Sequence, residues 1–348
     1  MTPRAWRLAA VLLTIMLAMV ACNGTGDESE AASVEPAESE APPAASEAAS
    51  AAPSEPASGG EPEIADLTVG VLPIVDVAPV YLAIEEGLFE DEGLTVTPEV
   101  MQGGAAAIPA LQGGDLDIAF GAWPSFLIAN QQGIELRAVA DGVAAVEGFT
   151  QFLAAADSDL EGNAAGMAGM TVALNTLGNL GELALRETLA DAGVDYSEVT
   201  AVEMPFPEMG AALDGGSVDV IWSVEPGVTG NTTNLGAVTV IDSYVDDMEN
   251  FPVAGYFVTA DFAEENPNTV AAFTRAVQAA ADMLNDDGEL RISTVQLYTE
   301  LPPALLEDVT FPEYRGEVEL DQLERVYEKM LEHEMIEEGL DIGALVLN

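Results

Sequence analysis

Cysteine and histidine, which serve as nucleophiles, bases and metal ligands, are scarce in this sequence. Its 348 residues include one cysteine, Cys22, and one histidine, His333, which lies on a Glu-rich segment near the C-terminus. A Cys/His metal site or a Ser-His-Asp arrangement would have to draw on that single histidine. No metal, cofactor or catalytic residue is therefore expected, and His333 is expected to be a solvated helix residue. An enzyme is the less favoured class of protein.

Basic side chains are also rare. The chain has 9 Lys and Arg residues against 61 Asp and Glu residues, for a formal net charge of −52, and Lys329 is its only lysine. A phosphate backbone needs a partner surface of the opposite sign, so nucleic acid is excluded as a partner. Because counterions screen repulsion between like charges, the excess of acids leads to the hypothesis of adaptation to a salty habitat.

The N-terminal segment has the pattern of a lipoprotein signal peptide. Residues 1–22 contain two arginines, an apolar run and small residues immediately before Cys22. The pattern predicts secretion and lipidation of Cys22, which would hold the protein on the outer face of a cell membrane. A plain signal or anchor helix with an incidental cysteine is the alternative. Residues 23–63 are mostly Ala, Ser, Glu, Pro and Gly with ten acids and no base, which predicts a disordered acidic tether.

One segment of the chain is repeated. Residues 109–124, PALQGGDLDIAFGAWP, recur 102 positions later as residues 211–226, AALDGGSVDVIWSVEP, with six of sixteen pairs identical. Each copy predicts the end of a helix, a Gly-Gly stop, a short buried strand, and a proline that can begin the next helix. Two uses of one α/β unit predict two similar lobes with a cleft between them.

Strands alternate with helices along the rest of the chain, which indicates an α/β fold with parallel sheets. We expect two lobes, each a mostly parallel sheet flanked by helices. The first lobe is predicted to contain residues 64–150 and 256–348, and the second residues 151–255. Hinges are expected where the chain crosses, near 148–149 and 253–255, and an amphipathic helix is expected at Leu320–Glu332.

In open parallel sheets, ligands bind where the strands end and helices begin. That rule selects six loops, at residues 73–78, 102–104, 121–125, 175–179, 204–208 and 223–226. Glycines in them allow close approach of backbone N–H groups, and helix N-termini favour an anionic group. The candidate ligand-binding residues are Asp76, Gly103, Gly104, Trp123, Ser125, Asn175, Thr176, Gly178, Asn179, Glu225 and Tyr256.

The six loops contain no Lys or Arg, but they contain the carboxylates Asp76, Glu208 and Glu225. A nitrate or sulfonate would have to rely on helix N-termini and amide donors. An amine, an amidine or a heteroaromatic ring bearing N–H groups suits carboxylates and indole faces better. A nitrogen-bearing organic solute is therefore favoured over a simple oxyanion.

Each candidate also has a purely structural alternative. Asp76 and Glu225 could stabilise helix N-termini without touching a ligand, and Asn179 could pair with Glu182 as an N-cap. Trp222 lies in a predicted buried strand and is expected to pack in the core, so Trp123 is the better candidate for the pocket. Tyr256 could also be a core residue.

At the level of whole motifs, the sequence resembles a known family. The residues that carry the resemblance are APVYLAIEEGLFEDEGLTV (78–96), QGG (102–104), ALQGGDLDIAF (110–120), VALNTLGNLGELAL (172–185) and DVIWSVEP (219–226). They are similar to solute-binding proteins of ABC importers that serve nitrate, aliphatic sulfonates, taurine and thiamine-pyrimidine precursors. The resemblance implies an α/β, two-lobed periplasmic-binding-protein fold that is type II-like. It also implies a monomer that closes on one small molecule and delivers it to a membrane permease with its ATPase.

Two other functions remain open at this point. A tethered pair of lobes could present its closed form to a membrane receptor, because delivery and signalling both use a ligand-bound closed state. An enzyme of the same fold could use two carboxylates across the cleft for glycoside chemistry. However, Asp76 and Glu225 occupy corresponding edges of a repeated unit, which suits clamping better.

Overall fold

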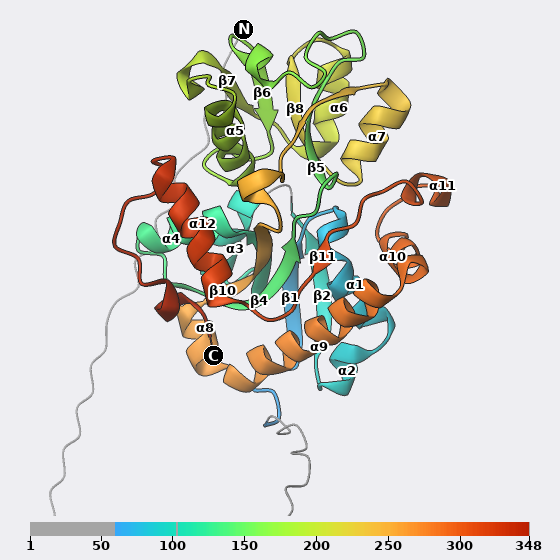
Figure 1. Cartoon of the computed structure of the whole chain (residues 1–348). Helices are drawn as coiled ribbons and strands as arrows, with labels where there is room; N and C mark the ends of the chain where they lie inside the picture. Colours follow the sequence, from blue (N-terminus) through green and yellow to red (C-terminus); the bar gives the residue numbers. More distant parts are fainter. Residues whose placement is uncertain (1–59, 102–103, 348) are drawn as a thin grey trace, which may run out of the picture. The chain divides into compact units, whose positions relative to one another are not determined.

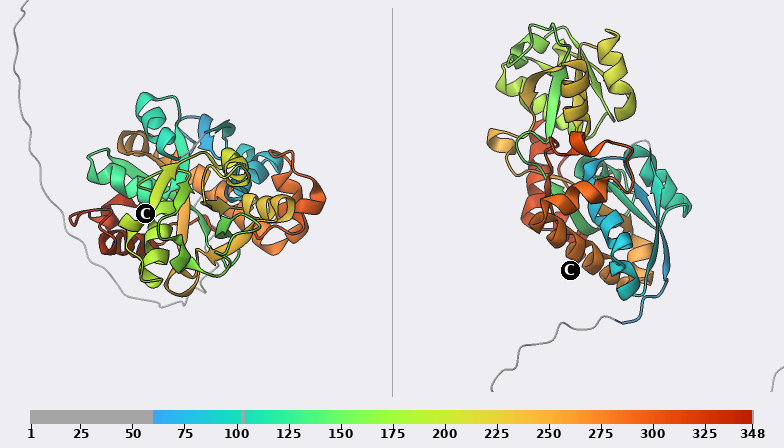
Figure 2. Two further views of the ribbon diagram at one scale, coloured as in Figure 1. Left: turned by 90° about the horizontal axis from the view of Figure 1, so that it is seen from above. Right: turned by 90° about the vertical axis from the view of Figure 1, so that its right-hand side faces the viewer.

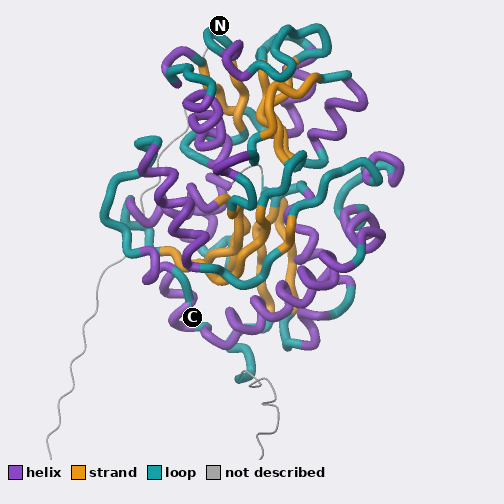
Figure 3. Tube along the Cα trace, viewed as in Figure 1, coloured by secondary structure: helices purple, strands orange, loops and turns teal. Residues whose placement is uncertain are grey.

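The computed structural model describes residues 60–101 and 104–347, which form two β-sheets flanked by helices (Figure 1). These residues do not include the predicted signal peptide, Cys22, nearly all of the predicted tether or Gly103. What the sequence predicts about those parts therefore stays a prediction. Among the described helices, none combines the length and the apolar character that crossing a membrane requires. Figure 3 shows the strands in two groups, each with helices around it.

The first sheet has the strand order β11-β4-β10-β3-β1-β2. Strand β1 pairs in parallel with β2 and β3, whereas β10 is antiparallel to both β3 and β4. Strands β1 to β4 therefore run in one direction, with β10 reversed between β3 and β4. The short β11 is also antiparallel to β4. The strands are Asp66–Val71 (β1), Thr95–Val100 (β2), Ile118–Ala122 (β3), Leu136–Ala144 (β4), Pro252–Thr259 (β10) and Glu313–Tyr314 (β11).

The second sheet repeats this arrangement with the order β7-β6-β8-β5-β9. Strand β6 pairs in parallel with β7 and β8, and β5 is antiparallel to β8 and β9. One strand is again reversed inside a sheet whose other strands run in one direction. The strands are Thr150–Ala154 (β5), Thr171–Leu174 (β6), Thr200–Glu203 (β7), Val220–Val224 (β8) and Val238–Asp242 (β9).

Two of the reversed strands, β5 and β10, come directly from the other sheet, whereas the third, β11, is a short strand at the edge of the first sheet. The chain passes from β4 into β5, and from β9 through residues 243–251 into β10. Each of these two strands begins at the cleft and runs away from it. The parallel strands run in the opposite direction, because they end at the cleft. The expectation of mostly parallel sheets is confirmed, with these exceptions. The expected second hinge at 253–255 is wrong, because Ala254 and Gly255 are paired inside β10. Gly255 instead makes room for the Trp123 ring, 2.2 Å from where a Cβ would lie.

Helices of the first lobe cover the first sheet, and helices of the second lobe cover the second sheet (Figures 1 and 2). The first lobe has α1 (Ala78–Glu85), α2 (Leu88–Asp91), α3 (Gly104–Gly113), α4 (Trp123–Gln131), α8 (Ala260–Glu265), α9 (Pro267–Asp286), α10 (Gly288–Val295), α11 (Pro303–Leu306) and α12 (Leu320–Glu332). The second lobe has α5 (Leu180–Asp191), α6 (Phe206–Asp214) and α7 (Gly227–Leu235). Short 3-10 turns occur at Val75–Val77 (η1), Ala164–Met167 (η2), Tyr196–Glu198 (η3), Asp246–Met248 (η4) and Ile342–Leu345 (η5).

The predicted amphipathic helix forms with the predicted bounds, as α12. It buries Leu323, Val326 and Met330, whose spacing of three and four residues places them on one face. That face packs against α4 and β10, so α12 belongs to the first lobe.

The repeated segment folds twice into the same unit, α3-β3-α4 and α6-β8-α7. Gly114 and Gly216 follow the first helix of each copy with left-handed φ angles of 74° and 64°, as expected for a helix stop. The repeated aspartates also have one role. An Asp117 carboxylate oxygen accepts the Thr68 N–H at 2.8 Å, and an Asp219 carboxylate oxygen accepts the Thr171 N–H at 2.8 Å. Each aspartate therefore ties the strand of the repeat to its parallel neighbour.

Candidate functional site

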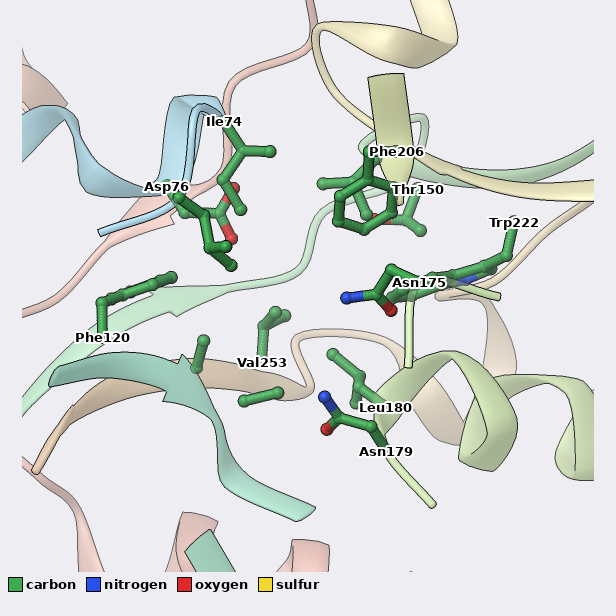
Figure 4. Close-up of a pocket in the computed structure, with 14 residues that line it drawn as sticks. Ile74, Asp76, Phe120, Thr150, Asn175, Asn179, Leu180, Phe206, Trp222 and Val253 are labelled. Atoms are coloured by element: carbon green, nitrogen blue, oxygen red, sulfur yellow. The ribbon is translucent and has the colours of Figure 1, made fainter. Parts of the chain in front are cut away.

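A pocket lies at the predicted binding edge, between the two sheets (Figure 4). Its walls come from both lobes and from both crossing strands. The lining residues are Leu72, Ile74, Asp76, Phe120, Ala122, Val253 and Ala254 from the first lobe, and Thr150, Asn175, Asn179, Leu180, Phe206, Trp222 and Val224 from the second. We call this the inner pocket.

A wider outer pocket adjoins it and shares Leu72, Ile74, Phe206 and Val224 with it. Met101, the last described residue before the predicted Gln-Gly-Gly turn, lines the outer pocket. The two pockets together give a small molecule a path to the inner one.

The repeat supplies matching positions on the two walls. Phe120 and Ala122 in β3 correspond to Trp222 and Val224 in β8, 102 residues later, and all four line the inner pocket. The two copies therefore present the same side of the same strand to one space. This geometry supports the prediction of opposed lobes around a cleft.

Asp76 is the carboxylate of the inner pocket. It lies in η1, just before α1, and only 1% of its surface is exposed. One of its carboxylate oxygens, Oδ1, has no hydrogen-bond partner within the described part of the chain. Burial raises the pKa of Asp76 to about 7. A buried carboxylate without a partner is costly in free energy, and a ligand that donates to it would remove part of that cost.

Three more polar side chains of the inner pocket have unpartnered atoms: Asn175 Oδ1, Asn179 Oδ1 and Thr150 Oγ1. Asn179 precedes α5 but makes no capping hydrogen bond with its side chain. Glu182 accepts the N–H of Gly178 at 2.8 Å and pairs with Arg186 at 2.7 Å. The alternative in which Asn179 serves only as an N-cap is therefore wrong, and its amide is available to a ligand.

The charge and shape of the inner pocket select for donors. Neither pocket has Lys or Arg among its lining residues in the described chain. Phe120, Phe206 and Trp222 provide aromatic faces, with the Phe206 and Trp222 ring centroids 6.0 Å apart. The indole N–H of Trp222 donates to Ser243 Oγ at 3.1 Å, which fixes the orientation of the ring. Oxygen acceptors beside aromatic faces suit a flat molecule with N–H groups.

The structure reverses the expected roles of two tryptophans. Trp222 lines the inner pocket, whereas Trp123 does not line it and is only 1% exposed. As the first residue of α4, Trp123 turns into the first lobe and packs edge-on against Phe126, with ring centroids 5.6 Å apart. The sequence pattern placed Trp222 in a buried strand correctly, but the buried face of that strand is a wall of the cleft.

Glu225 does not line either pocket, contrary to its selection as a ligand-binding residue. Its carboxylate accepts the Thr229 N–H at 3.0 Å, the Thr229 hydroxyl at 2.6 Å and the Thr310 N–H at 3.2 Å. Burial raises its pKa. The structural alternative, a carboxylate at the N-terminus of a helix, describes Glu225 in this structure. Asp76 therefore has no second carboxylate facing it across the inner pocket for glycoside chemistry.

The remaining described candidates lie elsewhere in the structure. Ser125 and Thr176 are buried, and Tyr256 is buried against the rings of Phe120 and Phe273. Gly178 has a left-handed φ of 66°, and Gly104 is the first residue of α3. Ser125, Thr176, Gly178 and Tyr256 are not among the lining residues of either pocket.

Besides Trp222, sequence reasoning did not select three aromatic or polar lining residues, Phe120, Thr150 and Phe206, and it selected none of the aliphatic lining residues for ligand binding. The repeat contained a signal for Phe120, because it corresponds to Trp222 and only one of the two positions had been considered. Phe206 lies inside the selected loop 204–208, so the loop was right and the residue was overlooked. Thr150 begins a crossing strand and carries no distinctive local pattern.

The sole histidine is not solvated. His333 Nε2 lies 2.5 Å from Glu187 Oε2, and 11% of each side chain is exposed. The expectation failed because the partner is 146 residues away in the sequence. In the portion that the structure describes, no cluster of three or more His, Cys, Asp or Glu side chains is placed to hold a metal ion.

Residues 60–298 match the NMT1-like family over more than half of the chain. The chain belongs to the NMT1-like family. The formylaminopyrimidine-binding protein of Halalkalibacterium halodurans is 28% identical over 141 residues, or 40% of this chain and 41% of that protein. The nitrate/nitrite binding protein NrtA of Synechococcus elongatus is 26% identical over 266 residues, or 69% of this chain and 59% of that protein. The chain thus spans well under two thirds of the length of these curated relatives.

The fold is shared with solved structures. The alkanesulfonate-binding protein SsuA from Xanthomonas axonopodis pv. citri, bound to MOPS, superposes with a TM-score of 0.71 at 18% identity. The match covers 82% of this chain and 99% of that protein. The expected two-lobed periplasmic-binding-protein fold is confirmed.

Proposed function

We propose that this protein is the extracytoplasmic solute-binding component of an ABC importer. It captures one small molecule between its lobes and delivers it to a membrane permease with its ATPase. The observation that carries the proposal is the inner pocket, which is lined by polar side chains of both lobes whose oxygen atoms have no hydrogen-bond partner among the described residues. A solute that touches both lobes adds binding energy only to the closed state and so shifts the population toward it. The named relatives bind a formylaminopyrimidine and nitrate or nitrite, which supports a small solute here.

The solute that fits best is a nitrogen-bearing organic molecule, with a pyrimidine precursor favoured over a sulfonate, taurine or nitrate. Asp76 and the two asparagines of the inner pocket accept hydrogen bonds from N–H groups, and Phe206 and Trp222 can stack on a flat ring. An anion would meet the Asp76 carboxylate without a cationic side chain to balance it. This charge balance, rather than the shape of the pocket, is what favours a nitrogen-bearing solute.

The proposal also includes a lipid anchor that attaches the protein to the membrane. A lipidated Cys22 and the acidic segment 23–63 would hold a monomeric receptor above the membrane, close to its permease. The high negative charge suits a salty medium. Metabolic labelling with a fatty-acid analogue tests the anchor, since Cys22→Ala should abolish the label.

A thermal-shift screen of the full chain in detergent at high salt tests solute binding. The panel contains aminopyrimidines, alkylamines, taurine, alkanesulfonates and nitrate. A ligand at a hundred times its dissociation constant adds about 2.7 kcal/mol to the free energy of unfolding. We expect a shift with aminopyrimidines and its loss in Asp76→Asn. If only sulfonates or nitrate shift the melting temperature, the proposal of a solute receptor stands and the proposal of a nitrogen-bearing solute is wrong. Chemical conversion of a bound compound would reject the receptor.

A further inference from the structure

The only lysine and the only histidine of the chain bind the same carboxylate. Lys329 Nζ lies 2.7 Å from Glu187 Oε1, and His333 Nε2 lies 2.5 Å from Glu187 Oε2. Lys329 belongs to α12, and His333 follows its last residue. Glu187 belongs to α5. Because α12 packs on the first lobe and α5 is part of the second, these contacts join the lobes.

This cluster is better protected from solvent than an ordinary surface pair. The side chains of Lys329, Glu187 and His333 are between 11% and 15% exposed. Arg275 and Glu92, which pair inside the first lobe, are 40% and 29% exposed. Exposed pairs contribute little and are screened by salt, whereas partly buried pairs are screened less. The cluster can therefore act in the salty medium proposed above.

Hydrogen bonds connect the cluster to the inner pocket. Arg186 donates to the backbone carbonyl of His333 at 3.3 Å and to Glu182 Oε1 at 2.7 Å and 2.9 Å. The other oxygen of Glu182 accepts the N–H of Gly178, next to Asn179, which lines the pocket. Arg186, Glu182, Gly178 and Asn179, which belong to α5 and its preceding loop, thus connect the end of α12 to the unpartnered Asn179 Oδ1 in the inner pocket.

We propose that Lys329, His333 and Glu187 form an interlobe clamp that stabilises the solute-binding arrangement from outside the pocket. They act as positioning residues, because none of them lines the inner pocket. The clamp holds α5, and with it the pocket loop 175–179, against the first lobe. Apparent affinity scales with the fraction of molecules in the competent arrangement, so releasing the clamp weakens binding without changing a contact to the solute.

The test measures the distance between the lobes without any solute, in the full chain with Cys22→Ala. Spin labels are attached after Glu99→Cys and Glu208→Cys, two exposed positions on opposite lobes beside the outer pocket. Glu187→Gln, Lys329→Met and His333→Gln are expected to shift or broaden the distance distribution. Glu92→Gln removes a carboxylate from the pair inside the first lobe and is the matched control. It should leave the distribution unchanged.

Amide hydrogen exchange provides a second readout. Exchange at Leu177 and Gly178 should accelerate in the clamp variants, because their N–H groups bond to second-lobe carboxylates near α5. An aminopyrimidine from the screen should bind about 5- to 10-fold more weakly, at the low end of the usual coupling between sites. Unchanged distances and exchange in folded Lys329→Met and His333→Gln would overturn the clamp. That outcome would leave solute binding intact, since neither readout depends on which solute binds.

Discussion

At the scale of single residues, the buried side chain of Asp76 determines much of the chemistry of the inner pocket. The loop rule located it from sequence, since it follows the first strand and precedes a helix with a proline near its start. Its unpartnered oxygen and its nearly complete burial could not be derived from sequence. They depend on β3 and β10 of its own lobe and on the opposite wall. The chemistry of the site is therefore a property of residues that are distant in the sequence.

The raised pKa of Asp76 predicts how stability depends on pH. The folded state favours the protonated carboxyl, because burial raises the pKa from 3.8 to about 7. Its contribution to stability is complete below about pH 3.8 and is lost as the pH rises through 7. Asp76→Asn should remove this loss and stabilise the solute-free protein at pH 8, by at most on the order of 4 kcal/mol. Urea unfolding from pH 4 to pH 8 measures it.

Asp141 provides a matched control for that experiment. Burial also raises its pKa to about 7, but it lies outside the inner pocket, with Arg315 Nη1 4.0 Å from its carboxylate. Asp141→Asn should change the pH profile of stability without affecting the response to aminopyrimidines. Loss of that response in both variants would show that Asp76 acts through stability alone.

For Glu225 we expect the opposite result, namely that a substitution changes stability but leaves solute binding unchanged. Its three hydrogen bonds, all to Thr229 and Thr310, occupy both carboxylate oxygens. Glu225→Gln should lower the free energy of unfolding by about 1–3 kcal/mol, because it weakens buried bonds to a charged acceptor. Thermal shifts with the solute panel should keep their size. If the shifts vanish while the variant remains folded, Glu225 takes part in binding.

At the scale of elements, local pattern and tertiary arrangement contribute differently. The bounds of α12 agree with the predicted ones, because its apolar spacing is a local signal. The reversed directions of β5 and β10 depend on where the chain has come from. No property of residues 150–154 distinguishes a parallel strand from an antiparallel one. For the same reason, the sequence pattern could not show whether Trp222 lines the cleft or packs in the core.

The repeated aspartates allow a test of the duplicated unit. Asp117→Ala and Asp219→Ala each remove an acceptor of a backbone N–H in the neighbouring strand. Each change should cost about 1 kcal/mol, and more for Asp117, whose bond is partly buried while that of Asp219 is exposed. Asp115→Ala, in the same turn as Asp117 and exposed, is the control. Chemical denaturation compares the three variants, and equal stability of all three would contradict the shared role.

The net charge is a property of the whole molecule. A chain with 61 acids and 9 Lys and Arg residues repels itself when compact. Added salt screens that repulsion, so the melting temperature should rise from dilute buffer to molar sodium chloride. Thermal melts across the salt series measure it. A melting temperature that stays constant would argue against adaptation to salt.

The position of β10 has a consequence for biosynthesis. This strand lies between β3 and β4, yet the ribosome produces it only after every strand of the second sheet. Until then β4 has no neighbour to join it to β3. The second lobe, whose strands form one uninterrupted stretch of sequence, can mature on the nascent chain while the earlier-made lobe is still waiting for its central strand. The lobe that is started first is thus the one that is completed last.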